Sequence, residues 1–197
     1  VSSLVLGACS AGSGSSNSEP IAQPAITSNV ASLKIQARTA QISNAPLPAT
    51  ANSWTYCRED IPDNAPLASY LGPTFEQRRN IPCRVKVKNM LAADGKYLST
   101  PPGVTPYSNQ ICGQVTLQSD VGVSVHMHGG RVQGYSSASG IASDGWPLQP
   151  MSWASNPYGF SVEKIYSYPN EQRATMLWYH DHAMDNNSTH VYAGLAG

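Results

Sequence analysis

Four of the five histidines stand in two pairs, and one residue separates the members of each pair. The pairs are His126-Met127-His128 and His180-Asp181-His182. Successive side chains of a β-strand point to opposite faces, so the imidazoles of a pair would share one face, about 7 Å apart along the strand. Imidazole binds zinc, copper, iron and nickel, whereas calcium and magnesium prefer oxygen. The spacing therefore predicts a transition-metal site to which two neighbouring strands each contribute a pair.

Zinc and two histidine-rich folds fit this pattern less well. Structural zinc sites usually include cysteine, and catalytic zinc usually keeps one position open, so four imidazoles on one zinc ion are not favoured. A cupin would carry a glutamate soon after its first pair, but residues 129–145 contain none. A metallo-β-lactamase would have a further Asp-His directly after the pair, where this chain has Ala183-Met184-Asp185-Asn186. A zinc hydrolase is therefore the most distant interpretation.

The elements that must position these pairs are short strands with a period of two. Gly122–His126 reaches the first pair, and Ala174–His180 reaches the second. The other predicted strands are Leu33–Arg38 at a sheet edge, Arg84–Asn89, Gln114–Leu117 and Val162–Tyr166. No long helical period appears, charged residues make up only 12% of the chain, and 16 glycines and 15 prolines interrupt it. The sequence predicts an all-β Greek-key sandwich or barrel.

Five segments carry a resemblance to a known family, in that family's order: His126–Gly130, Ser143–Gly145, Tyr168–Arg173, Leu177–Met184 and Val191–Gly197. They resemble the first cupredoxin domain of the multicopper oxidases, in the branch of the bacterial spore-coat laccases, bilirubin oxidases and phenoxazinone synthases. Gly72–Glu76 resembles an early strand of that domain, so the resemblance covers roughly residues 65–197. It implies a cupredoxin-like Greek-key β-sandwich or barrel.

The resemblance also implies copper ligands. His126 corresponds to a ligand of the type 2 copper, and His128, His180 and His182 correspond to ligands of the paired type 3 coppers. Together they would supply half of a trinuclear cluster that reduces dioxygen to water with four electrons from a small reducing substrate. Asp144 corresponds to an acidic residue thought to help deliver protons to reduced oxygen, although Ser-Asp-Gly is also an ordinary turn sequence.

This chain lacks the residues that would bind the type 1 copper of the family. Such a site needs a cysteine and two histidines, yet no cysteine follows Cys112 and no histidine precedes His126. The resemblance therefore implies further C-terminal cupredoxin domains of the same protein. Residues 31–197 are predicted to be an N-terminal cupredoxin domain, truncated at its C-terminus and inactive on its own. Phenols, bilirubin-like pigments, Cu(I) and Mn(II) stay open as reducing substrates, and the alternative function is a lipid-anchored copper-binding or copper-delivery module without turnover.

Four further side chains near the pairs are predicted to support the fold. Asp181 should point away from the cluster by strand alternation. Trp178 and Tyr179 are expected to pack in the core, as large aromatic residues in strands usually do. His190 stands outside both pairs, where the family usually has Asn, and is expected to be a surface or a satisfied buried histidine.

The first residues predict export. Val1–Cys9 looks like the end of a secretory signal, and Leu6-Gly7-Ala8-Cys9 resembles the bacterial lipobox, whose cysteine carries the lipid. Residues 10–30 begin with a Ser/Gly-rich stretch and predict a disordered tether. We expect a lipoprotein of the bacterial cell envelope, periplasmic or on the outer surface, held at the membrane by its acyl chains.

The cysteines and the net charge bear on disulfide formation and on the kind of partner. In an exported protein, one disulfide could form among Cys57, Cys83 and Cys112, and one thiol would remain. Twelve basic residues balance twelve acidic ones, and no basic run could follow a phosphate backbone. Nucleic acid is therefore not expected as a partner.

Overall fold

The computed structural model describes residues 21–41, 50–63, 65–91, 110–111, 115–116, 122–134, 143–147, 150–151, 161–184 and 187–197. These residues form eight strands and one short helix. Within them we find no helix with the length and apolarity that a membrane crossing requires. Cys9 of the predicted lipobox, residues 10–20 of the predicted tether and Cys112 lie outside the described residues.

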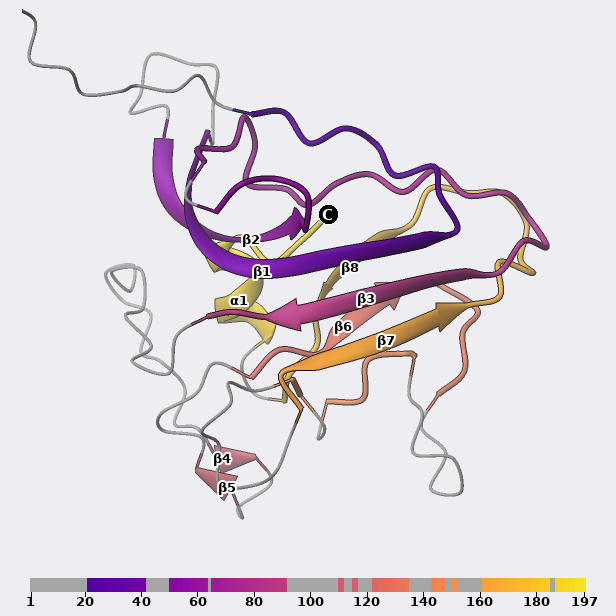
Figure 1. Ribbon diagram of the computed structural model, residues 1–197. Helices are drawn as coiled ribbons and strands as arrows, with labels where there is room; N and C mark the ends of the chain where they lie inside the picture. Colours follow the sequence, from indigo (N-terminus) through magenta and orange to yellow (C-terminus); the bar gives the residue numbers. More distant parts are fainter. Residues whose placement is uncertain are drawn as a thin grey trace, which may run out of the picture.

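The larger sheet has four strands in the order β2-β1-β3-β7 (Figure 1). They are β1 (Val30–Gln41), β2 (Thr50–Arg58), β3 (Cys83–Asn89) and β7 (Glu163–Tyr168). β1 pairs antiparallel with β2 and parallel with β3, and β3 pairs antiparallel with β7. Parallel neighbours need a long crossover connection, so β1 and β3 meet only after the chain has formed β2 and returned.

The predicted strand Leu33–Arg38 is part of β1, but its predicted place at a sheet edge is wrong, because β2 and β3 flank it. Its alternating apolar and polar residues suggested a half-exposed strand. Lys34 is only 7% exposed, however, because its ammonium group donates hydrogen bonds to the Ile61 carbonyl at 2.7 Å and the Asp63 carboxylate at 2.5 Å. A partnered charge can be buried, so this polar position does not mark a solvent face.

Two segments with no predicted strand take part in the fold. One is β2, in which the side chains of Ser53 and Thr55 are buried. Because these buried residues are polar, the sequence lacks the alternation by which a strand is predicted. Residues 21–29, which were predicted to belong to the tether, instead run beside the chain at 65–77, where the buried Ile26 bridges to Phe75. The tether boundary predicted at residue 30 therefore lies too far along the chain.

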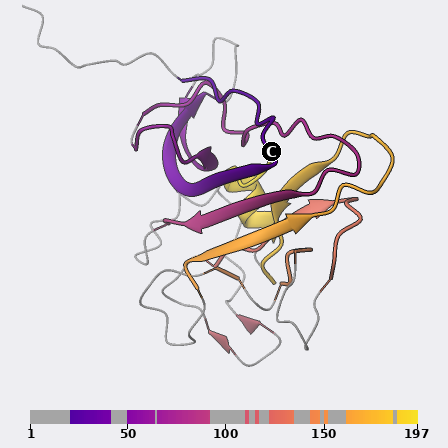
Figure 2. The same cartoon turned by 45° about the vertical axis from the view of Figure 1, so that its right-hand side comes forward.

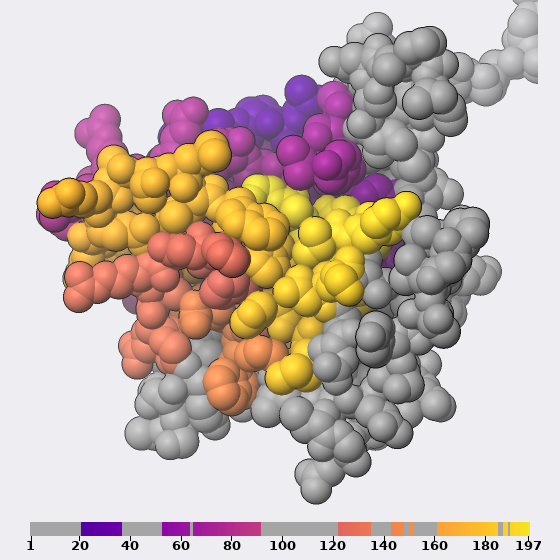
Figure 3. Space-filling model, turned by 180° about the vertical axis from the view of Figure 1, so that it is seen from behind, coloured from indigo at the N-terminus to yellow at the C-terminus, as the bar shows by residue number. Residues whose placement is uncertain are grey.

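A second layer lies on one side of the larger sheet (Figures 1 and 2). Its strands β6 (Val125–His128) and β8 (Trp178–Asp181) pair antiparallel, and helix α1 (Asn187–Ala193) contacts β8 and β2. Seen from behind, the segments that contain β6, β8 and α1 adjoin one another on the surface (Figure 3). The two histidine pairs thus belong to the layer opposite the four-stranded sheet.

The described strands form an open arrangement of two layers and no closed barrel. The strands β4 (Gln110–Ile111) and β5 (Val115–Thr116) make a separate antiparallel pair. The all-β prediction is therefore confirmed in its sandwich form.

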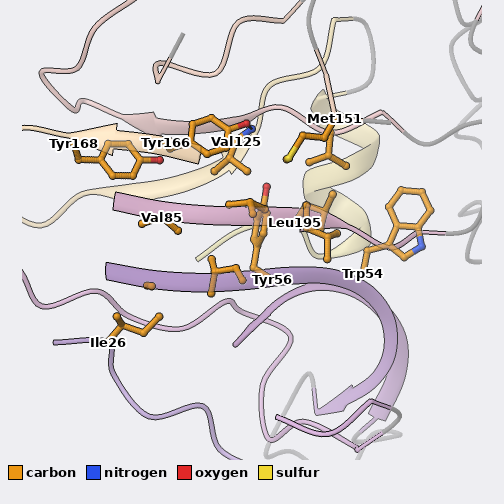
Figure 4. Close-up of a cluster of buried hydrophobic side chains, with 14 of the residues drawn as sticks. Ile26, Trp54, Tyr56, Val85, Val125, Met151, Tyr166, Tyr168 and Leu195 are labelled. Carbon is orange, nitrogen blue, oxygen red and sulfur yellow. Dashed lines mark hydrogen bonds between the residues drawn. The ribbon is translucent and has the colours of Figure 1, made fainter. Parts of the chain in front are cut away.

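The core lies between the two layers (Figure 4). Cys83, Val85 and Val87 of β3 face into it and the residues between them face outward, as the alternation predicted. Val125 meets them from the second layer. Its amide donates a hydrogen bond to the buried Tyr166 hydroxyl at 3.0 Å, so one tyrosine of β7 joins the larger sheet to the strand that carries the first histidine pair.

Helix α1 was not predicted from the sequence. It ends at Ala193 and is followed by Gly194, whose φ of 119° lies in the left-handed region and whose amide donates a hydrogen bond to the Val191 carbonyl at 3.0 Å. Glycine commonly ends helices in this conformation. A Cβ at this position would also collide with the Ser53 side chain and the Trp54 carbonyl, so the helix docks on β2 at the glycine.

Cys57 and Cys83 are both buried and are not joined to each other. Burial raises the pKa of the Cys83 thiol, which keeps it protonated near neutral pH. Of the three pairings that were open, the one between these two cysteines is therefore not formed.

Candidate metal site

The register of β6 and β8 brings the two histidine pairs together. His126 lies directly opposite His180, and His128 lies opposite Trp178. His182 follows the end of β8, and its amide donates a hydrogen bond to the Ser124 carbonyl at 2.7 Å. Residues two apart share a face, so both pairs present their imidazoles on the same side of this two-stranded sheet.

The four imidazoles form one cluster. The ring centroids of His126 and His182 are 4.4 Å apart, with the rings stacked, and His126 is 5.4 Å from His180. The centroids of His128 and His180 are 5.6 Å apart. One ring nitrogen each of His126, His128 and His180 lies within 4.8 Å of the others, which suits joint metal coordination.

Backbone carbonyls fix the orientation of three of these rings. Nδ1 of His126 donates a hydrogen bond to the Asp144 carbonyl at 2.7 Å, and Nδ1 of His182 donates to the Gly145 carbonyl at 3.0 Å. Nδ1 of His180 donates to the Asp181 carbonyl at 2.6 Å. A carbonyl oxygen can only accept, so each of these rings carries its proton on Nδ1. The lone pair of Nε2 is left for a metal ion, as in many metal sites that histidine builds.

His128 is held differently and is the exposed member of the cluster. Its Nδ1 faces Nε2 of His180 at 3.4 Å. Metal–imidazole bonds are about 2 Å long, so nitrogens at this separation can bind the same ion. The chain therefore offers Nδ1 from His128, whereas His126, His180 and His182 offer Nε2.

The protonation state of His180 suits a ligand. Burial lowers its pKa, and the neighbouring histidines His126, His182 and His128 lower it further, while its bond to the Asp181 carbonyl acts in the opposite direction. Metal ions bind neutral imidazole, so an environment that disfavours the imidazolium ion favours coordination.

The turn at Ser143–Gly145 supplies two of the three orienting carbonyls, one for each histidine pair. Gly145 has a φ of 75°, and a Cβ there would collide with the Val125 carbonyl oxygen, so only glycine lets the turn lie this close to β6. The structure places the Asp144 carboxylate 3.3 Å from Nδ1 of His126, with 44% of the side chain exposed. This carboxylate thus contacts the outer nitrogen of the ring, and its part in proton delivery stays a prediction.

Trp178 corrects one prediction, because it is not a core residue. The indole is 44% exposed and stacks on His180 at 4.2 Å and on His128 at 5.2 Å between ring centroids. Strand alternation could have placed it there, since it lies two residues before His180. Tyr179 does pack in the core, against Phe75, as predicted.

Two residues behind the cluster form a buried pair. The Asp181 side chain is fully buried, and His190 of α1 is 3% exposed. Nδ1 of His190 donates a hydrogen bond to the Asp181 carboxylate at 2.8 Å. Of the two expectations for His190, a satisfied buried histidine is the one confirmed.

Known proteins are similar to this chain in sequence and in fold, although no family model matches it. A laccase of Bacillus stratosphericus is 35% identical over 130 residues, which cover 64% of this chain and 22% of the laccase. A bilirubin oxidase of Albifimbria verrucaria is 43% identical over 74 residues, which cover 38% of this chain and 10% of that protein. The chain therefore spans less than a quarter of the length of these curated relatives.

A solved structure gives the same fold. The multicopper oxidase from Campylobacter jejuni superposes with a TM-score of 0.50 and 19% identity, over 91% of this chain and 29% of its own. At this identity the likeness shows the fold alone, which is the cupredoxin fold that the sequence predicted. Taken with the sequence matches to a laccase and a bilirubin oxidase, this likeness supports the predicted resemblance of the chain to the first cupredoxin domain of the multicopper oxidases.

Proposed function

We propose that His126, His128, His180 and His182 are copper ligands and supply half of the trinuclear cluster of a laccase-like multicopper oxidase. In this assignment His126 binds the type 2 ion, and the other three bind the paired type 3 ions. The observation that carries the proposal is the fixed orientation of three rings, whose Nδ1 atoms donate to backbone carbonyls and whose Nε2 atoms are therefore free to bind metal.

The donor set fits copper. All four side chains are imidazoles, a ligand that copper accepts readily, and the lowered pKa of His180 favours the neutral ring. When bound, the copper ions would supply the one-electron steps by which dioxygen is reduced to water. The protein holds the ligands in place through the turn at residues 143–145, and we propose Asp144, whose carboxylate is partly exposed, as a proton carrier between solvent and the site.

The proposed reaction also needs an oxidant, a reducing substrate and further copper ligands. We propose that dioxygen is the oxidant, that a phenol, a pigment or a metal ion is the reducing substrate, and that further cupredoxin domains of the same protein supply the type 1 copper and the other cluster ligands. The relatives are named as oxidases, which leaves the alternative of a copper-delivery module without support. The lipobox resemblance supports a further proposal, that the protein is a lipoprotein held at the bacterial cell envelope.

Copper titration of the 197-residue chain tests the ligand assignment. Cu(II) quenches nearby indoles, and Trp178 stacks on two of the proposed ligands, so tryptophan emission together with metal analysis reports binding. We expect saturable uptake by the wild type and its loss in His126→Ala and in His180→Ala. Met176→Ala is the control for adventitious copper binding at the surface, because the Met176 side chain is 95% exposed. We expect this variant to take up copper as the wild type does. Wild-type uptake by both histidine variants would overturn the proposal.

A further inference from the structure

We infer that the buried pair of Asp181 and His190 is a positioning device that clamps the second histidine pair against the strand of the first and thereby sets the copper affinity of the cluster. The inference rests on the proposed function, since it concerns the same cluster. His190 is not one of the four clustered imidazoles, and neither residue is assigned a part in copper binding by the ligand pattern.

The Asp181 carboxylate receives hydrogen bonds from three donors, one beside it in the chain and two from other elements. Its Oδ1 accepts from the Ser124 amide at 2.8 Å, and its Oδ2 accepts from the Ala183 amide at 3.2 Å and from Nδ1 of His190 at 2.8 Å. Side chains of both members of the pair are almost wholly removed from water. A buried carboxylate is tolerated only when it is hydrogen-bonded, and bonds to an ionised acceptor are about twice as strong as neutral ones.

These three donors adjoin the proposed ligands. Ser124 stands two residues before His126, and Ala183 directly follows His182. The Ser124 carbonyl accepts a hydrogen bond from the His182 amide at 2.7 Å, so Ser124 is tied to the second pair on both its amide and its carbonyl. The carboxylate therefore fixes the point at which the chain leaves β8 and turns His182 toward the cluster.

Helix α1 supplies the third donor. His190 packs edge-on against Trp54 of β2, with ring centroids 5.3 Å apart and an interplanar angle of 67°. Its carbonyl accepts a hydrogen bond from the Leu195 amide at 3.0 Å, beyond the end of the helix. The imidazole is thus held from two sides, and its Nδ1–H is directed at Asp181. Loss of this donor would leave a buried carboxylate short of one partner and free to shift the residues on either side of it.

Three substitutions in the 197-residue chain test this role by copper titration. His190→Leu keeps an apolar side chain against Trp54 but removes the donor, and we expect copper affinity to fall about 10- to 100-fold, the usual cost of losing a partner behind a ligand. Asp181→Asn keeps the volume and removes the charge, and we expect a loss in the same range. His190→Asn restores an N–H donor through its amide, and we expect affinity to recover to within about threefold of the wild type.

Lys34→Ala separates positioning from general stability, since it removes a buried partnered charge from the other sheet. We expect it to lower the resistance to urea, followed by far-ultraviolet circular dichroism, while copper affinity and the electron paramagnetic resonance spectrum of bound Cu(II) stay as in the wild type. If Lys34→Ala loses as much affinity as His190→Leu, the pair acts only through stability, and the inference is overturned.

The remaining outcomes distinguish this inference from the proposed function. Absence of copper uptake by the wild type would defeat the ligand assignment itself. Wild-type affinity in both His190→Leu and Asp181→Asn would defeat the inference alone. Equal losses in His190→Asn and His190→Leu would also defeat it, because the hydrogen bond would then not be what matters. If His190→Leu does not fold, the copper affinities of Asp181→Asn and His190→Asn are compared instead. The inference requires weaker binding by Asp181→Asn than by His190→Asn.

Discussion

At the scale of single residues, the cluster depends on what lies behind each imidazole. Three rings donate to backbone carbonyls, and two of those carbonyls belong to neighbouring residues, Asp144 and Gly145. One turn thus orients His126 from the first pair and His182 from the second. A small displacement of this turn would misalign a ligand of each pair at once.

Gly145→Ala should therefore damage both the fold and the site. The left-handed φ costs an L-residue about 1–3 kcal/mol, and the added Cβ collides with the Val125 carbonyl. We expect a fall of at least this size in the free energy of unfolding in urea, with weaker copper uptake by titration. Gly134→Ala is the matched control, because a Cβ there meets nothing within 4 Å. An alanine at 145 that behaves like the alanine at 134 would contradict the role given to the turn.

At the scale of the elements, two buried tyrosines of the larger sheet differ in what their hydroxyl groups contact. The buried Tyr166 hydroxyl accepts a hydrogen bond from the Val125 amide and so joins β7 to β6. The Tyr56 hydroxyl is also buried, but it has no hydrogen-bond partner among the described residues. Burial raises the pKa of both phenols, and the charge of Asp181 adds to the shift, so both stay protonated.

These two tyrosines should respond in opposite ways to loss of the hydroxyl. Tyr166→Phe leaves the Val125 amide without its acceptor and should lower the free energy of unfolding by about 1–3 kcal/mol. Tyr56→Phe removes a buried hydroxyl that is not hydrogen-bonded, and should be neutral or stabilising by about 1 kcal/mol. Urea unfolding followed by circular dichroism compares them, and the reverse order would contradict the hydrogen-bond assignment.

The same elements show what the sequence can predict. Alternation located β3, because Val85 and Val87 face the core and the charged residues beside them do not. It also located β6 and β8, although in β8 the apolar Trp178 is exposed and the polar Asp181 is buried. It misplaced β1, because Lys34 is buried with its own partners, and it missed β2, where Ser53 and Thr55 are buried. Helix α1 is only seven residues long and packs on β2 at Gly194. A helix this short has no apolar repeat from which it could be predicted.

The site was predictable to the same extent and for the same reason. The spacing of two residues within each pair predicted that both pairs lie on one face of their strands, and in the structure they do. The partners behind the rings were not predictable, because three of them are backbone carbonyls, which any residue type can offer. The Asp181 bond to His190 depends on the position of a helix that the pattern does not contain.

At the scale of the whole molecule, the cluster links segments that are far apart in the chain. His126 and His180 are joined across two strands, and the turn at 143–145 and α1 hold the cluster from outside. A metal ion bound by both pairs would be lost on unfolding, since the unfolded chain does not keep the four rings together. Binding free energy therefore adds to the free energy of folding.

Copper should accordingly stabilise the chain. At free Cu(II) about 100 times its dissociation constant, linkage predicts a gain of about 2.7 kcal/mol in the free energy of unfolding. Urea unfolding with copper, and again after EDTA is added, measures the gain and its reversal. The double variant His126→Ala/His180→Ala should show no gain, and an equal gain in that variant would indicate that copper binds elsewhere.

The direct opposition of His126 and His180 has a consequence for the order of events during maturation. Each His-x-His motif reads the same in both directions, so sliding β8 by two residues would set His182 against His126 and His180 against His128 and would still gather four imidazoles on one face. Copper alone would not distinguish the two alignments. The Asp181 carboxylate can, because its three donors surround it in only one of them. We therefore expect the two strands to align before copper binds, since copper bound first could hold either alignment.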